Sequence, residues 1–265
     1  MAYARTDLDM RDGASQPAIR RISPADLKDA LHKGFDDLMV MPSFAVFVVV
    51  VYPVIGLLLM WLTFGYERFP LLFPLIAGFP IIAPFAALAL YELSRRREQG
   101  LPVSWSALDD MSASRVRAAL TLGLVLLAVF AAWIATATLL YEYIFAGWVP
   151  PSFEAFVHEI LTTRAGATLI IVGCGVGLIF ALIAFAISAI SFPMVLDRDV
   201  DAATAMRTSV RAVTENPTTM GLWAIIIAGT LVLASLPFLA GLIVVLPLLG
   251  HATWHLYRKV VAPAE

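Results

Sequence analysis

Residues 216–257 decide the class of this protein. The stretch is NPTTMGLWAIIIAGTLVLASLPFLAGLIVVLPLLGHATWHLY, 42 residues without a single Asp, Glu, Lys or Arg. Because about 20 apolar residues are enough for one helix to cross the hydrocarbon core of a bilayer, this stretch is long enough for two helices. Pro237 and Gly241 offer a turn near its middle. The stretch therefore predicts a helical hairpin in a membrane.

Four more charge-free stretches precede it, each with the length of one crossing: 38–66, 69–91, 118–141 and 165–196. In the whole chain 60% of the residues are hydrophobic and 14% are charged, whereas soluble domains have about 45–50% apolar and about 25% charged residues. This composition excludes an ordinary soluble enzyme and predicts an all-α, polytopic membrane helix bundle. The net charge of -2 excludes the basic balance of a nucleic-acid-binding protein.

The distribution of basic residues predicts six spans with both termini in the cytoplasm. With six spans, 16 of the 18 Lys and Arg residues lie on the side of the N-terminus, and only Arg68 and Arg164 lie opposite. Positive charges gather on the cytoplasmic side of an inner membrane, so this arrangement is preferred to five spans. The predicted helices are 43–65, 70–92, 118–141, 166–191, 219–236 and 238–257.

A short amphipathic helix precedes each predicted hairpin. Residues 23–38 begin with Ser23 as N-cap and Pro24 in the first turn, and residues 201–216 have apolar side chains at helical spacing. The two segments align, with Ala30-Leu31 on Ala205-Met206 and Pro42 on Pro217. A weaker third copy contains Ala107-Leu108. We therefore predict three hairpins, each preceded by a helix that lies along the cytoplasmic interface.

The domain organisation follows from these segments. We expect residues 1–22 to be a disordered cytoplasmic N-terminus, 23–260 to be one transmembrane domain and 261–265 to be a short cytoplasmic tail. The first 38 residues contain no long hydrophobic run, so no cleavable signal peptide is expected. The one cysteine, Cys174, excludes an intramolecular disulfide framework and a multi-cysteine metal site.

Candidate site residues are few. His251 and His255 lie four residues apart on the last predicted span, where two imidazoles could bind a metal or flank a haem, or simply anchor the helix at the interface. The spans offer no carboxylate as a further ligand, so we expect neither a metal nor a cofactor, with the two histidines as weak metal candidates. The sequence contains no Walker loop, dinucleotide fingerprint, Gly-x-Ser-x-Gly or His-Glu-x-x-His motif. We expect no catalytic residue and no enzymatic activity.

Two further groups of residues indicate contacts with lipid and with helices. Basic side chains at the cytoplasmic ends of spans are expected to contact anionic headgroups or to form ion pairs with nearby acids such as Glu92; they are Arg95, Arg96, Arg97, Arg258 and Lys259. Small residues on the fourth span allow a close approach of another helix, from this chain or from another protein. They include Gly173, Gly177 and Ala181.

Three stretches carry a resemblance to a bacterial family of predicted integral membrane proteins of unknown function. They are residues 84–97 (PFAALALYELSRRR), 196–217 with Leu196-Asp-Arg-Asp-Val at its start, and 247–258 (PLLGHATWHLYR). The resemblance extends from about residue 25 to residue 260. Some members of that family carry a label that connects them to cytochrome c oxidase. For this chain the label would imply an accessory or assembly partner, because the spans contain too few histidines for the haems and copper of an oxidase.

Three functions stay open at this point. The small loops and scarce intramembrane polar groups favour a non-catalytic accessory, scaffold or assembly component of an inner-membrane complex, with the lipid bilayer and other membrane proteins as partners. The internal repeat and proline-containing spans favour a transporter or channel for a small molecule or ion. The pair His251 and His255 favours a haem or metal protein.

Overall fold

The computed structural model describes residues 17–41, 69–81, 83–103, 111–236 and 241–263, which are helical apart from connecting segments and one isolated β-bridge. The elements are α2 (Pro24–Val40), α4 (Phe69–Gly78), the 3-10 helix η2 (Phe79–Ile81), α5 (Ala83–Ala86), α6 (Leu88–Glu98), α7 (Ala113–Phe145), α8 (Phe153–Thr162), α9 (Arg164–Ser188), α10 (Ser191–Asp197), α11 (Ala202–Glu215), α12 (Pro217–Ser235) and α13 (Leu242–Val260). The predicted first span at 43–65 and the third amphipathic copy at Ala107-Leu108 lie outside the described residues.

Three described segments are long and apolar enough to cross a bilayer: α7, the combined segment Arg164–Asp197 and α12. The all-α class and the presence of several candidate spans are thereby confirmed. The segment α13 has 19 residues, but its C-terminal half is polar and contains both histidines of the last predicted span. Six spans stay a prediction.

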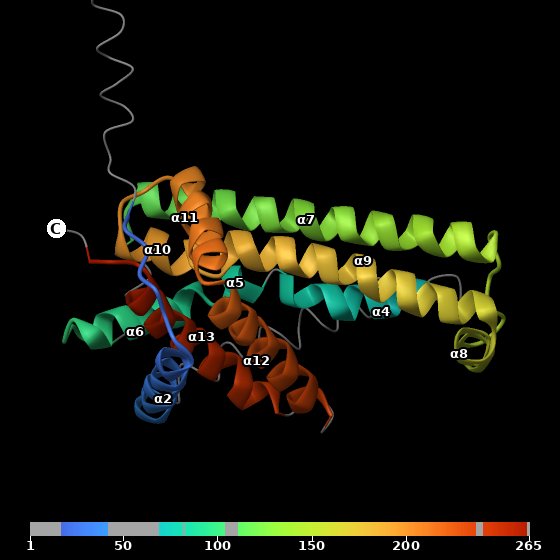
Figure 1. Cartoon of the computed structure of the whole chain (residues 1–265), viewed down its shortest axis with the longest axis horizontal. Helices are drawn as coiled ribbons and strands as arrows, with labels where there is room; N and C mark the ends of the chain where they lie inside the picture. Colours follow the sequence, from blue (N-terminus) through green and yellow to red (C-terminus); the bar gives the residue numbers. More distant parts are fainter. Residues whose placement is uncertain (1–16, 42–68, 82, 104–110, 237–240, 264–265) are drawn as a thin grey trace, which may run out of the picture.

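The helices α7 and α9 run side by side as a long hairpin, with the short helix α8 at its far end (Figure 1). Ala146 and Gly147 adopt positive φ angles and end α7, which is the usual left-handed stop of a helix. Within the hairpin, Trp133 of α7 lies against Gly177, where a Cβ would be 3.1 Å from the indole ring. A Cβ on Gly173 would be 3.8 Å from Leu140 of α7, whereas Ala181 is exposed.

The predicted helix 70–92 is interrupted rather than continuous, because the chain passes from α4 through η2 and α5 to α6. Pro80 and Pro84 lie in this break. Each proline removes a backbone donor and its ring obstructs the preceding turn, which accounts for the interruption. The last segment, α6, then continues past the predicted end at residue 92 to Glu98.

The predicted helix 166–191 is also divided. The helix α9 ends at Ser188, and α10 starts at Ser191 after a break at Ala189 and Ile190. The Ile190 N–H donates to Ser209 Oγ of α11 at 3.1 Å. The backbone N–H that the break leaves without a partner in its own helix is thus hydrogen-bonded to a neighbouring helix.

The described residues nearest to the two ends of the chain lie next to each other. Ile19 forms an antiparallel bridge with Val261, and Arg20 N–H donates to the Val260 carbonyl at 2.7 Å. Asn216 adds a second connection, because its side chain accepts from the N–H of Ile22 and donates to the carbonyl of Arg20. The expectation of disorder is therefore wrong for residues 17–22, whose backbone groups find partners on distant segments. Residues 1–16 lie outside the described part of the chain.

Both predicted amphipathic helices are present. The helix α2 starts at Pro24, and the Asp26 carboxylate accepts from the Ser23 N–H at 2.9 Å. The helix α11 starts at Ala202, and the Asp201 carboxylate accepts from the Thr204 N–H at 2.7 Å. Each helix has a carboxylate in place for otherwise unpaired backbone donors of its first turn.

Each of these helices packs onto the end of a different hairpin. The helix α2 packs along α13 in what we call the α2 joint, and α11 packs on α9 and α10 in what we call the α11 joint. Both joints lie at the end of the molecule opposite α8, together with α6 (Figure 1). In the α2 joint the backbones come close, because a Cβ on Gly34 would lie 2.6 Å from the Ala252 nitrogen.

The two helices bury equivalent positions. At a shift of 175 residues, the buried positions match in four pairs: Leu27 with Ala202, Ala30 with Ala205, Gly34 with Ser209, and Asp37 with Ala212. This agreement supports the predicted internal repeat. Its proposed marker Pro42 lies outside the described residues, so the superposition of Pro42 on Pro217 stays a prediction.

Candidate functional site

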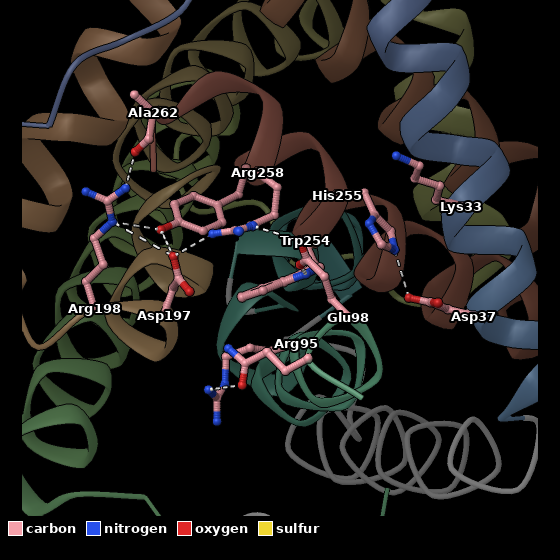
Figure 2. A network of polar contacts seen from close by, with 12 residues as sticks. Lys33, Asp37, Arg95, Glu98, Asp197, Arg198, Trp254, His255, Arg258 and Ala262 are labelled. Atoms are coloured by element: carbon pink, nitrogen blue, oxygen red, sulfur yellow. Dashed lines mark hydrogen bonds and ion pairs between the residues drawn. The ribbon is translucent and has the colours of Figure 1, made fainter. Parts of the chain in front are cut away.

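A buried polar cluster lies where α2, α6 and α13 meet. Its centre is Asp37 of α2, which is only 3% exposed. The Asp37 carboxylate accepts from Ser94 Oγ of α6 at 2.6 Å and lies 2.9 Å from His255 Nε2 of α13. It also forms an ion pair with Arg97 of α6. Three helices that are distant in sequence thus share one carboxylate (Figure 2 shows Asp37 facing His255).

His251 extends this cluster into the interior. Its Nδ1 lies 2.7 Å from Ser94 Oγ, and both side chains are fully buried. Because the Ser94 hydroxyl donates its only proton to Asp37, it accepts from His251 Nδ1–H. This arrangement assigns the neutral tautomer of His251 with a bare Nε2. That Nε2 is buried and has no hydrogen-bond partner within the described residues.

The surroundings of Asp37 favour its ionised form. Burial raises the pKa of Asp37. Hydrogen bonds from His255 and Ser94, and the positive charges that His255 and His251 carry when they are protonated, lower it by more and hold the pKa of Asp37 below its usual value of 3.8. The ion pair with Arg97 adds a permanent positive charge on the other carboxylate oxygen. Asp37 is therefore a carboxylate at neutral pH.

The sequence selected His251 and His255 as a pair, and the structure brings both to the same cluster. Their ring nitrogens are used differently, since His255 Nε2 faces Asp37 while His251 Nδ1 faces Ser94. Among the residues that the structure describes, no group of three or more His, Cys, Asp or Glu could hold a metal ion. The absence of a metal or haem stays a prediction.

Asp37 and Ser94 were not among the site residues predicted from the sequence. A signal for Asp37 was present, because it lies on the same face of α2 as the buried residues Leu27, Ala30 and Gly34. A charged side chain on the apolar face of an amphipathic helix is costly unless it has partners. Ser94 gave no such signal by itself, since serine beside three arginines is unremarkable at the end of a span, and it stands out only when the ends of several helices are compared.

A second polar cluster lies next to the first, between the ends of α10 and α13 (Figure 2). Asp197 accepts from Tyr257 OH at 2.6 Å and from Arg258 at 3.1 Å. Arg258 also donates to Glu98 at 3.1 Å, and Glu98 accepts from the Trp254 indole at 2.9 Å. The ends of α6, α10 and α13 are thus connected by side chains.

Every basic residue that was expected to contact lipid has a carboxylate partner. Arg95 forms two hydrogen bonds with Glu92, at 2.7 and 2.8 Å, and these bonds raise the pKa of Arg95. The remaining pairs are Arg96 with Glu92, Arg97 with Asp37, Arg258 with Glu98 and Asp197, and Lys259 with Asp26 and Asp29. The alternative of ion pairing is therefore present, while lipid contact stays a prediction.

The C-terminal ends of α6, α10 and α13 share a short motif that supports the predicted repeat. A leucine, a polar residue and an arginine occur in this order at the ends of α6, α10 and α13. They are Leu93-Ser94-Arg95, Leu196-Asp197-Arg198 and Leu256-Tyr257-Arg258. The three leucines are buried, and the three helix ends contact one another. This triplet is a sequence signal that would have singled out Ser94 as a residue at the place where three helix ends meet.

The fold and its apolar helices define a multi-pass integral membrane protein. Residues 72–197 match the model of a family described as "Predicted integral membrane protein (DUF2189)". The chain is similar to this family, whose function is unknown, over the segment from α4 to α10, a shorter part than the expected range of 25 to 260. No curated protein and no solved structure shows significant similarity to the chain.

Proposed function

We propose that this protein is a non-catalytic integral protein of the bacterial inner membrane that serves as an accessory, scaffold or assembly component of a membrane complex. A respiratory-chain or terminal oxidase complex is the candidate partner. The proposal includes six spans and two cytoplasmic termini. The bridge between Ile19 and Val261 supports this topology, because adjacent ends on one side of the membrane require an even number of crossings.

The observation that carries the proposal is the contrast between the two ends of the molecule. At one end the charged side chains of α6, α10 and α13 are paired with each other and with α2. At the other end α7 and α9 project as an apolar hairpin (Figure 1). In the most apolar stretch of the segment Arg164–Asp197, only 6% of the residues are buried. We call the end formed by α2, α6, α10 and α13 the base. A base that is held together by ion pairs, with an uncovered apolar helix projecting from it, suits association with other membrane helices.

The surface of α9 also has the right side chains for such association. Ala181 and Cys174 are exposed on it, and small residues allow a partner helix to come close in lipid, where van der Waals packing drives association. The α2 and α13 side of the base adds Arg258 and Lys259, which are partly exposed. These charges would place the base at an anionic headgroup surface.

The test is purification of the tagged full chain from the native membrane in mild detergent, followed by mass spectrometry of the co-purifying chains. Ala181→Trp places a large ring on the exposed surface of α9 and should remove the partner. The matched control is Leu124→Trp, which changes an exposed leucine of α7 and should keep it. Recovery of the chain without any stoichiometric partner would contradict the proposal.

One observation favours a transporter or channel as a second candidate. The interrupted segment from α4 through η2 and α5 leads directly into α6, which carries Ser94 of the buried cluster. Interrupted membrane helices beside polar groups form the substrate sites of many transporters. Uptake of a labelled solute into proteoliposomes that contain the pure protein would favour this candidate over the scaffold.

The third candidate, a haem or metal protein, is tested on the same purified material. A Soret band or stoichiometric metal that is lost in both His251→Ala and His255→Ala would replace the scaffold proposal. A colourless, metal-free chain with a stable partner would leave the scaffold as the better account.

A further inference from the structure

We propose that Asp37, Ser94, His251 and His255 form a proton-exchange site, which passes a proton between the cytoplasmic surface and the buried Nε2 of His251. This role goes beyond a scaffold, because it gives the cytoplasmic end of the protein a ligand of its own. The ligand is a proton, and its carriers are side chains that exchange protons in many membrane proteins.

The geometry is a continuous chain of hydrogen bonds. It runs from His255 Nε2 to Asp37 Oδ2 at 2.9 Å, on to Ser94 Oγ at 2.6 Å and then to His251 Nδ1 at 2.7 Å. Every distance lies within the normal range of a hydrogen bond between such atoms. The chain also has a direction, since the side chain of His255 is 13% exposed and the side chain of Asp37 is 5% exposed, while Ser94 and His251 are fully buried.

The inner end of the chain is open. A buried imidazole nitrogen without a partner is rare, because an unmade hydrogen bond in the interior costs free energy. Among the described buried side-chain atoms, His251 Nε2 is such an orphan that is able to accept a proton. Its lone pair is therefore the natural entry or exit point for a proton on the interior side.

The transfer can be written with every proton accounted for. A proton that binds His251 Nε2 forms an imidazolium. The imidazolium then releases its Nδ1 proton to Ser94 Oγ while the Ser94 hydroxyl proton moves to Asp37 Oδ2. The result is a neutral His251 that carries its proton on Nε2 and a neutral Asp37. His255 Nε2, which faces Asp37, takes up the Asp37 proton after it has released its own proton to solvent. The reverse sequence carries a proton inward, and no other reactant is needed.

The charged groups around the chain support such transfer. Arg97 of α6 pairs with the second oxygen of Asp37. Its positive charge lowers the affinity of the carboxylate for a proton, so that a transferred proton does not stay bound to Asp37. On α13, Arg258 is paired with Glu98 and Asp197, and Lys259 is paired with Asp26 and Asp29. On α2 Asp36 and Lys33 pair with other residues of the same helix.

The α11 joint shows that packing does not require this cluster. At the position of Asp37 it has Ala212, which is fully buried, and α11 still packs on α9 and α10. A helix of this register therefore docks with an apolar side chain. A buried carboxylate with two histidines costs more desolvation free energy than an alanine at this position. Such groups are expected where they act on a ligand.

The experiment is nitrogen NMR of the full chain with ¹⁵N-histidine in lipid nanodiscs. In the wild type we expect His251 in the tautomer with Nδ1–H and a bare Nε2. This measurement needs no variant. A His251 whose resting state in the wild type carries the proton on Nε2 would overturn the proposal, because the inner end of the chain would then have no free lone pair.

The second readout is the rate at which the His251 ring proton exchanges with solvent. We expect Ser94→Ala to slow this exchange at least tenfold, and Ser94→Thr to restore it, since threonine keeps the hydroxyl. The matched control is Ser191→Ala, which removes another fully buried hydroxyl, bonded to the Ser188 carbonyl. Equal exchange rates in wild type and Ser94→Ala would show that the cluster is purely structural and would overturn the proposal.

Discussion

The α2 joint and the α11 joint hold two helices of the same register by different chemistry. In the α2 joint, Gly34 lets the backbones touch, and Asp37 lies among Ser94, Arg97 and two histidines. In the α11 joint, Ser209 and Ala212 take the equivalent places, and Ser209 accepts a neutral hydrogen bond from the Ile190 N–H. The comparison teaches that a helix with this pattern of buried positions packs on its neighbours without a charged cluster, and that the charged cluster belongs to the α2 joint.

The largest expected effect comes from removing the carboxylate of the α2 joint. Asp37→Ala leaves Arg97 and the histidines without their acceptor, and breaking such a buried ion pair costs about 3 kcal/mol, the lower end of the usual range because Arg97 is partly exposed. Thermal unfolding in detergent measures the loss. Asp36→Ala, one residue away and half-exposed, is the control. Equal melting temperatures for the two variants would refute the central role of Asp37.

The next effect concerns the close approach of α2 and α13. Gly34→Ala places a Cβ 2.6 Å from the Ala252 nitrogen and 2.8 Å from its Cα, and overpacking against backbone costs about 1–3 kcal/mol. The control is Gly221→Ala on α12, where a Cβ would meet nothing within 4 Å. We expect the first variant to melt earlier and the second to melt no earlier than the wild type.

Acid should loosen the α2 joint and spare the α11 joint. The pKa of Asp37 is held below 3.8 in the folded protein, so its contribution to stability is complete above that pH and disappears as the pH falls through the folded value. Limited proteolysis between pH 5 and pH 3 should release α2 first. In Asp37→Asn the release of α2 should depend less on pH between pH 5 and pH 3. If the release of α2 depends on pH as much as in the wild type, other carboxylates are responsible for it.

The smallest effect is expected in the α11 joint. Ser209→Ala removes the acceptor of the Ile190 N–H, and one neutral hydrogen bond contributes about 1 kcal/mol. Thr208→Val serves as control, because the Thr208 hydroxyl only donates to the Thr204 carbonyl within the same helix. A melting temperature for Ser209→Ala as low as that of Asp37→Ala would contradict the distinction between the two joints.

Local signals predicted much of the secondary structure. Ser23, Pro24 and Asp26 marked the start of α2, and charge-free stretches marked α7, α9 and α12. The interruptions between α4 and α6 were less accessible. Prolines 80 and 84 indicated a kink, but whether a helix bends or breaks depends on which neighbours satisfy the freed backbone groups.

The order of residues 17–22 was missed for a related reason. This segment has no periodic apolar pattern, and its structure comes from hydrogen bonds to Val260, Ala262 and Asn216 near the other end of the chain. Such pairing is invisible to any window of the sequence, because the partners are almost the whole chain apart.

The sequence by itself determined that this is a helical, multi-pass membrane protein, because the class depends on composition and on the length of charge-free runs, which are local quantities. It also placed His251 and His255 on one face of a helix, since their spacing is four residues. Only the tertiary structure decided that this face meets Asp37 of α2 and Ser94 of α6. Those contacts depend on how closely two helices pack, and Gly34 against Ala252 sets that distance.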